Sequence, residues 1–169
     1  MNQNVEIKAH VHDLARMHEV AARLSGSGPE ILEQHDVFYN CPTGRLKLRS
    51  FPTGIGELIY YHRPDAAGPK TSSYWLTRVP DANSLAATLA AALGEVGVVD
   101  KTRSLYLVGR TRIHVDRVAG LGDFLELEVV LGDGESVAGG EEEAQALLIE
   151  LGVASSDLIE GAYIDLQSS

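Results

Sequence analysis

Runs of alternating charged and apolar residues are the feature that most limits how this 169-residue chain can fold. In an extended strand, side chains two residues apart point to the same face, so each run predicts a strand with one charged face. Ten of the fourteen lysines and arginines occupy such strand-like positions: Lys8, Arg45-Leu-Lys47-Leu-Arg49, Arg63, Lys70, Lys101-Thr-Arg103 and Arg110-Thr-Arg112. Each run should point its cations to one side of its strand.

The overall charge of the chain is opposite to that of these runs. The sequence has 24 aspartates and glutamates against 14 lysines and arginines, a formal net charge of −10. Cations gathered on strand faces in such an acidic protein call for a concentrated anionic partner, for which polyphosphate is the natural candidate. Carboxylates share the two-residue spacing, in Glu6-Ile-Lys8 and Glu126-Leu-Glu128. This combination suits a metal-bridged phosphate, in which carboxylates hold a hard divalent cation and Arg or Lys holds the phosphate oxygens.

Composition argues against several other classes of protein. The 44% hydrophobic content is that of a soluble globular protein, and no apolar run approaches the roughly 20 residues that span a bilayer. The start of the chain lacks the basic and apolar regions of a secretory signal, and its one cysteine, Cys41, cannot form an internal disulfide. We therefore expect a cytoplasmic protein without a membrane partner. The acidic balance also argues against nucleic acid, whose backbone needs an outward basic patch.

Periodicity and turn residues predict eight strands and three helices in one domain that covers residues 1–169. The expected strands are 5–11, 33–39, 45–51, 57–63, 70–78, 98–108, 110–118 and 124–131. The expected helices are 14–24, capped by Asp13, 85–93, capped by Asn83 or Ser84, and 141–151, opened by an acidic run. A short helical turn near Asp157 and an extended piece over 162–166 complete the chain.

The order of these elements decides the expected fold class. Strands and helices do not alternate regularly, so a parallel doubly wound sheet is disfavoured and an antiparallel sheet that closes on itself is favoured. We therefore predict an α+β, mainly β protein, namely a closed antiparallel barrel of about eight strands with about three flanking helices. In such a barrel the charged strand faces converge in the lumen, while the outer apolar positions pack under the helices.

The alternating runs belong to short motifs that are spread over nearly the whole chain. The motifs are Asn4-Val-Glu6-Ile-Lys8, His35-Asp36-Val-Phe-Tyr39, Gly44-Arg-Leu-Lys-Leu-Arg49, Lys101-Thr-Arg103, Thr111-Arg-Ile-His-Val-Asp116 and Gly122-Asp-Phe-Leu-Glu126-Leu-Glu128. Together they resemble the CYTH superfamily of triphosphate tunnel metalloenzymes, which includes class IV adenylyl cyclases, thiamine triphosphatases and inorganic triphosphatases. Residues 108–124 are most similar to the class IV cyclase branch. The family signature is Glu-x-Glu-x-Lys, so Asn4 stands in place of a glutamate and offers a weaker, neutral oxygen.

The resemblance implies a tunnel that binds a triphosphate together with Mg²⁺ or Mn²⁺. The implied metal ligands are Glu6, Asp116, Glu126 and Glu128. The expected substrate ligands are Lys8, Lys47, Arg49, Lys101, Arg103 and Arg112, to which the strand pattern adds Arg63 and Lys70. The expected catalytic residues are Glu6, Lys8, Arg49, Asp116 and Glu126. The implied partner is a small-molecule triphosphate (ATP, tripolyphosphate or thiamine triphosphate), and the oligomeric state is left open, with a homodimer as one arrangement.

Some local questions stay open at this level. Many family members place a lysine in a Tyr-Lys-Gly-Pro context where this chain reads Tyr61-His62-Arg63-Pro64, so either His62 or Arg63 faces the tunnel. A histidine such as His114 could ligate a metal, but the absence of His-x-His or Cys-x-x-Cys spacing favours an oxygen site for a hard cation. His114 is then expected to be a hydrogen-bonding group of the lumen. Each motif taken singly would also fit a solvated, salt-bridged strand face, and only their conjunction favours the tunnel.

One cage of cations and metal can serve two reactions, because phosphoryl and nucleotidyl transfer depend mainly on charge neutralisation. A nucleotide 3′-hydroxyl in line with the α-phosphorus gives cyclic AMP and pyrophosphate, whereas water at the γ-phosphorus gives a diphosphate and orthophosphate. The similarity of residues 108–124 to class IV cyclases slightly favours ATP cyclisation, with a triphosphatase as the alternative. A non-catalytic polyphosphate or nucleotide sensor is a third hypothesis, which Asn4 permits and the remaining carboxylates oppose.

Overall fold

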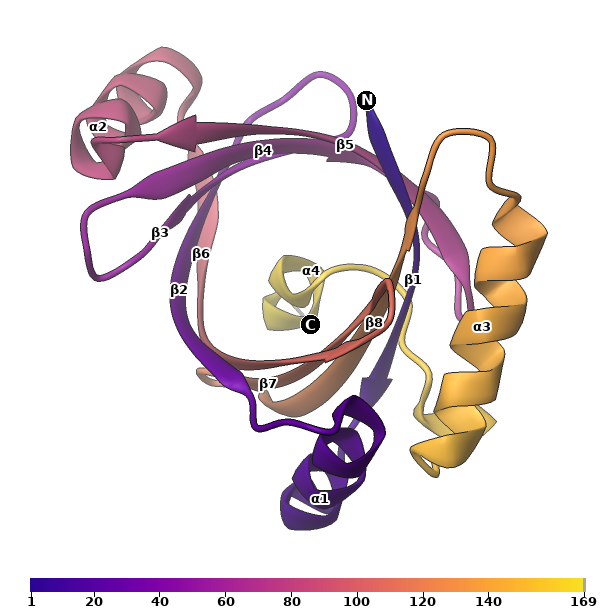
Figure 1. Ribbon diagram of the computed structural model, residues 1–169. Coiled ribbons are helices and arrows are strands. Elements are labelled where there is room, and N and C mark those ends of the chain that lie inside the picture. Colours follow the sequence, from indigo (N-terminus) through magenta and orange to yellow (C-terminus); the bar gives the residue numbers. More distant parts are fainter. Residues whose placement is uncertain (169) are drawn as a thin grey trace.

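Eight antiparallel strands close into a barrel in the computed structural model, which describes residues 1–168 (Figure 1). Around the barrel the strand order is β1-β5-β4-β3-β2-β6-β7-β8, so the first strand pairs with both the fifth and the last. The strands are β1 (Asn2–His10), β2 (Glu30–Tyr39), β3 (Arg45–Ser50), β4 (Gly56–His62), β5 (Lys70–Val79), β6 (Glu95–Val108), β7 (Thr111–Val118) and β8 (Gly122–Leu131). The predicted mainly β, closed-barrel fold is confirmed.

Helices α1 (Leu14–Ser25), α2 (Ala82–Leu93) and α3 (Val137–Glu150) cover parts of the outer face of the barrel, whereas α4 (Tyr163–Gln167) lies inside the ring of strands (Figure 1). Helix α1 packs on β6 and β7, α2 on β2 and β3, and α3 on β1 and β8. None of the helices within residues 1–168 is both long and apolar enough to cross a membrane.

Alternation along the strands separates the apolar core from the barrel interior. In β8, Leu125 and Leu127 are fully buried on the outer face, where they pack in one cluster with residues of α1 and α3. Glu126 and Glu128 of the same strand line a cavity inside the barrel. Because the side-chain period of a strand is two, burying the leucines under the helices directs the glutamates inward.

The first two helices begin at side chains that accept hydrogen bonds from the backbone. Asp13 caps α1, as predicted, by accepting from the Arg16 N–H group. Helix α2 begins earlier than expected, because Asp81, and not Asn83 or Ser84, is its N-cap. The Asp81 carboxylate accepts from the N–H group of Ser84 at 3.0 Å.

Helix α3 also begins ahead of the expected position. Ser136 caps it by accepting from the Gly139 N–H group at 3.1 Å, so the helix does not open at Glu141. The acidic run instead supplies Glu143, which accepts a hydrogen bond from Arg110 at 2.9 Å on the outer side of the barrel. Arg110 lies in the turn between β6 and β7, so the expectation that it shares a face with Arg112 is wrong.

The C-terminal segment lies across one end of the barrel, where Figure 1 shows α4 inside the ring of strands. Residues 162–166 were expected to be extended, but Tyr163–Gln167 form α4, whose start is fixed by the Asp165 side chain accepting from the Ala162 N–H group at 2.8 Å. The segment joins a cluster of buried apolar residues made of Phe38, Val99, Val118, Phe124, Ile159, Ala162, Tyr163 and Ile164. The expected helical turn near Asp157 is present as a 3-10 helix, Ser155–Asp157.

A buried hydrogen bond fastens this segment to β7 and predicts a measurable loss of stability. The Tyr163 hydroxyl donates to the Asp116 carboxylate at 2.8 Å, and both side chains are buried. Tyr163→Phe should lower the free energy of unfolding by about 1.5–3 kcal/mol, the usual contribution of a hydrogen bond to a charged group. Tyr60→Phe is the matched control, since that hydroxyl contacts Thr43 at an exposed site. Equal losses in denaturant unfolding of the two variants would contradict this account.

Candidate functional site

The barrel encloses a cavity of about 770 Å³ that all eight strands help to line. Its charged lining residues come from the inward positions of the alternating runs. Among the predicted site residues, the cavity brings together Glu6, Lys8, Lys47, Arg49, Arg63, Lys101, Arg103, Arg112, Glu126 and Glu128. These residues are separated widely in the chain, so only closure of the barrel makes them neighbours.

One charge cluster in this cavity is centred on Asp36, a residue of β2 that pairs directly with Arg49 of β3. The Arg49 guanidinium donates two hydrogen bonds of 2.8 Å to the carboxylate of Asp36. Lys47 and Lys101 donate to the same carboxylate at 3.1 and 3.0 Å. We call these four residues the Asp36 cluster.

Burial and charge act in opposite directions on the pKa values of the Asp36 cluster. Burial by itself would raise the pKa of Asp36, but the charges of Arg49, Lys47 and Lys101 outweigh it and hold this pKa well below its usual range. Burial lowers the pKa of Lys101 to about 7, a decrease that Asp36 opposes and that Arg49 and Arg103 reinforce. Lys101 is therefore a lysine that titrates near neutral pH.

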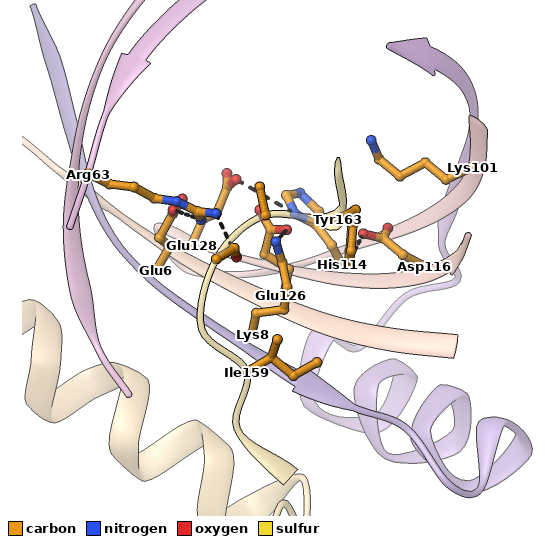
Figure 2. A network of polar contacts seen from close by, with 12 residues as sticks. Glu6, Lys8, Arg63, Lys101, His114, Asp116, Glu126, Glu128, Ile159 and Tyr163 are labelled. Carbon is orange, nitrogen blue, oxygen red and sulfur yellow. Dashed lines mark hydrogen bonds and ion pairs between the residues drawn. The ribbon is translucent and has the colours of Figure 1, made fainter. Parts of the chain in front are cut away.

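A second cluster is built on Asp116 of β7 (Figure 2). Arg103 donates to both Asp116 oxygens, at 2.8 and 2.7 Å, and also lies 3.5 Å from Glu126. Lys8 lies 3.5 Å from the same Glu126 oxygen and 4.0 Å above the centre of the Tyr163 ring. Asp116 is fully buried, and its oxygens are taken by Arg103 and the Tyr163 hydroxyl.

Three side chains form a group that could hold a metal ion. Ligand atoms of His114, Glu126 and Glu128 all lie within 4.8 Å of one another. Burial and the neighbouring Glu126 charge raise the pKa of Glu128 to about 7, because two adjacent buried carboxylates resist full ionisation. Burial, reinforced by Arg103, holds the pKa of His114 well below its usual range. Its buried Nδ1 atom has no hydrogen-bond partner among the described residues.

These properties fit a divalent cation. A cation would offset the repulsion between the two carboxylates, and neutral imidazole is a metal ligand. The Oδ1 atom of Asn4, buried in the same cavity, also has no hydrogen-bond partner within residues 1–168. An amide oxygen at this position could add a neutral ligand, as the sequence comparison with the family signature suggested.

The register of the fourth strand is settled in favour of Arg63. Its guanidinium donates to the Glu6 carboxylate (Figure 2) and, at 2.8 Å, to the carbonyl of Gly161. His62, in contrast, is exposed. Arg63 thus joins an inward carboxylate of β1 to the C-terminal segment.

Two expected site residues are not brought to the cavity surface. The Lys70 ammonium group donates to the carbonyls of Ala66 and Ile159, at 2.9 and 3.5 Å, and is buried against the C-terminal segment. Asp116, expected as a metal ligand, lies behind Arg103 and outside the three-residue group described above. Its position favours orientation of Arg103 over contact with a metal.

Sequence reasoning missed three contributors to the site. Asp36 was seen only as part of a motif, although the two-residue period of its strand already placed it on one face with Gln34 and Phe38. His114 was expected in the lumen, but as a hydrogen-bonding group in preference to a metal ligand, and it lies beside Glu126 and Glu128. No local signal could have found Tyr163, because its role depends on a C-terminal segment folding back into the barrel.

Comparison with known proteins extends these observations. The adenylate cyclase CyaB of Aeromonas hydrophila is 26% identical over 173 residues, which cover 94% of this chain and 85% of that protein. The structure of the PH1012 protein of Pyrococcus horikoshii superimposes with a TM-score of 0.84 at 23% identity, over 96% of this chain and 98% of the other. The structure of HpAC1 from Hippeastrum, described as having a dominant triphosphatase activity, gives a TM-score of 0.64 at 15% identity, over 96% and 91%.

The family model of the CYTH domain matches residues 2–163, nearly the full length of the chain. These residues contain every strand of the barrel and every cavity-lining side chain named above. The chain therefore belongs to the CYTH family.

Proposed function

We propose that this chain is a divalent-metal-dependent enzyme that acts on a triphosphate inside its barrel and converts ATP to cyclic AMP and pyrophosphate. The observation that carries the proposal is the meeting, in one cavity, of buried cations with a carboxylate and histidine group that fits a metal ion. A cavity with only cations would suit anion binding, whereas this combination suits chemistry at phosphorus.

Two groups of cations in the cavity are expected to bind the phosphates. Lys47, Arg49 and Lys101 converge from β3 and β6, while Lys8 and Arg103 converge from β1 and β6 beside Glu126. Charge-assisted hydrogen bonds from such groups would fix the triphosphate and oppose the negative charge that develops during transfer.

Glu126, Glu128 and His114 would hold the divalent cation, and the Asn4 oxygen of the same cavity would serve as a neutral donor. When bound, Mg²⁺ or Mn²⁺ would neutralise phosphate charge and polarise the reacting phosphoryl group. Glu6 is paired with Arg63, so it could join the ligand set only by giving up this ion pair.

Two features favour a nucleotide as the substrate. The curated relative is an adenylate cyclase, at 26% identity over most of both chains. In addition, Leu76 of β5 and Leu107 of β6 line the cavity yet are 41% and 56% exposed, on strands from opposite sides of the barrel. Exposed leucines beside a cationic cage provide an apolar contact for an organic group, which inorganic tripolyphosphate lacks.

A triphosphatase is the second candidate. The Hippeastrum protein shares the fold and is described with a dominant triphosphatase activity, so the fold itself does not select between the two reactions. The same cations and metal would then serve attack by water on the terminal phosphorus.

Metal binding and turnover should both be lost when one of the two clustered carboxylates is removed. Glu126→Gln should reduce turnover by at least the roughly 10–100-fold seen when even supporting residues of metal sites are changed. Mn²⁺ binding, followed by electron paramagnetic resonance, should weaken in parallel, while far-UV circular dichroism stays unchanged. Glu142→Gln on the exposed face of α3 is the matched control and should retain activity. Full activity of the wild-type chain in excess EDTA would refute a metal-dependent reaction.

The two reactions predict different products from the same panel of substrates. The chain should be incubated with Mg²⁺ or Mn²⁺ and ATP, tripolyphosphate or thiamine triphosphate, and the products resolved by chromatography. Cyclisation requires the ribose 3′-oxygen beside the α-phosphorus, so we expect cyclic AMP and pyrophosphate in equal amounts from ATP and no turnover of tripolyphosphate. Orthophosphate from both ATP and tripolyphosphate, without cyclic nucleotide, would instead establish a triphosphatase.

A further inference from the structure

One carboxylate in the cavity holds three cations at once. Both oxygens of Asp36 are used: Oδ1 accepts from Arg49 Nε at 2.8 Å, and Oδ2 accepts from a terminal Arg49 nitrogen, Lys47 and Lys101 at 2.8, 3.1 and 3.0 Å. The Asp36 side chain is 1% exposed, whereas those of Arg49 and Lys47 are 11% and 15% exposed and line the cavity. The carboxylate is therefore the most buried member of the cluster, and two of its cations remain accessible.

Charge explains why this arrangement needs a carboxylate. Three buried cations so close together repel one another, and each loses hydration that only an anion can replace. In the absence of a ligand, Asp36 is the anion in contact with all three. One negative charge against three positive charges leaves a positive excess, so the cluster can still attract a more highly charged anion from the cavity.

We propose that Asp36 is a positioning residue whose carboxylate holds Lys47, Arg49 and Lys101, before the substrate binds, in the array that receives the phosphates. This inference rests on the proposed triphosphate substrate. Asp36 takes the place of a phosphate oxygen in the free protein and then shares its cations with the ligand. It needs no contact with the reacting atoms.

Lys101 can report on this role because its pKa of about 7 makes its protonation near neutral pH depend on the charges around it. Asp36 from β2 faces its ammonium group, together with the cations Lys47 and Arg49 from β3 and Arg103 from its own strand; the Tyr163 ring lies 5.9 Å away. Of the charged groups named here, only Asp36 favours the charged form, so its removal should lower the Lys101 pKa further below about 7. At pH 7–8 a smaller fraction of Lys101 would then be protonated in the free protein.

The direct test is the titration of Lys101 by NMR, using the ¹³Cε resonance of labelled lysine. The midpoint should lie near pH 7 in the wild-type chain and at lower pH in Asp36→Asn. Asp100→Asn is the matched control, because that neighbouring carboxylate is 58% exposed and accepts from His35 instead. An unchanged Lys101 midpoint in folded Asp36→Asn would overturn the proposal.

Binding of inorganic tripolyphosphate in EDTA, measured by calorimetry, gives a second readout. A bound anion favours charged Lys101, so affinity should fall as pH rises above the free pKa. The ratio of Asp36→Asn to wild-type affinity should fall between pH 5 and 9 by about tenfold for each unit that the substitution takes from the Lys101 pKa. A residue that only maintains packing would give a ratio independent of pH, which would contradict the proposal. Absence of wild-type binding at every pH, both in EDTA and with Mg²⁺ present, would instead refute the triphosphate substrate, and the NMR result would still decide the role of Asp36.

A double variant keeps the proposal testable if the Asp36→Asn variant alone does not fold. If Asp36 balances the cations, then removing one of them as well should relieve the repulsion. Asp36→Asn with Lys101→Met should therefore melt at a higher temperature than Asp36→Asn alone. A double variant that is no more stable than the single one would show that charge balance is not what Asp36 supplies.

Discussion

Pairing of opposite charges inside the barrel is the interaction on which the rest of the structure depends. Arg49 and Arg103 are almost fully buried, and each donates two hydrogen bonds to an aspartate, Asp36 or Asp116. An unpaired charge at such depth costs several kcal/mol, so the free barrel could not hold its cations inward without these carboxylates. The pairs make a charged cavity compatible with a folded protein, and they also fix the geometry of the groups that would meet a phosphate.

The apolar core outside the barrel and the charged cavity inside it are consequences of one alternation. Leu125 and Leu127 pack under α1 and α3, and the intervening Glu126 therefore points into the lumen. A slip of one residue in the pairing of β8 would place leucines in the cavity and carboxylates under the helices. The free energy gained by burying the leucines thus holds the candidate metal ligands in place.

The C-terminal segment makes one end of the barrel different from the rest of the cavity. It fills one end of the barrel with apolar side chains and supplies Tyr163 to Asp116 and the Gly161 carbonyl to Arg63. Exposed residues such as Leu107 line the cavity elsewhere. The segment therefore contacts residues that position the charged groups of the site. A change in it would disturb Arg103 through Asp116, and Glu6 through Arg63.

The sequence by itself determined the strands, the inward set of charges and the closed barrel. The reason is that the two-residue period of a strand is a local property, which is visible directly in Arg45–Arg49 and Glu126–Glu128. Only the tertiary structure decided which charges meet. That Asp36 holds Lys101, that Arg63 and not His62 faces Glu6, and that Lys70 donates to the Ile159 carbonyl all depend on strands distant in sequence or on the folded-back C-terminus. Helix α4 was missed for the same reason, since residues 162–166 gain their stability from packing inside the barrel. Local periodicity fixes the face of a side chain, whereas its partner across a closed sheet is fixed by register and closure.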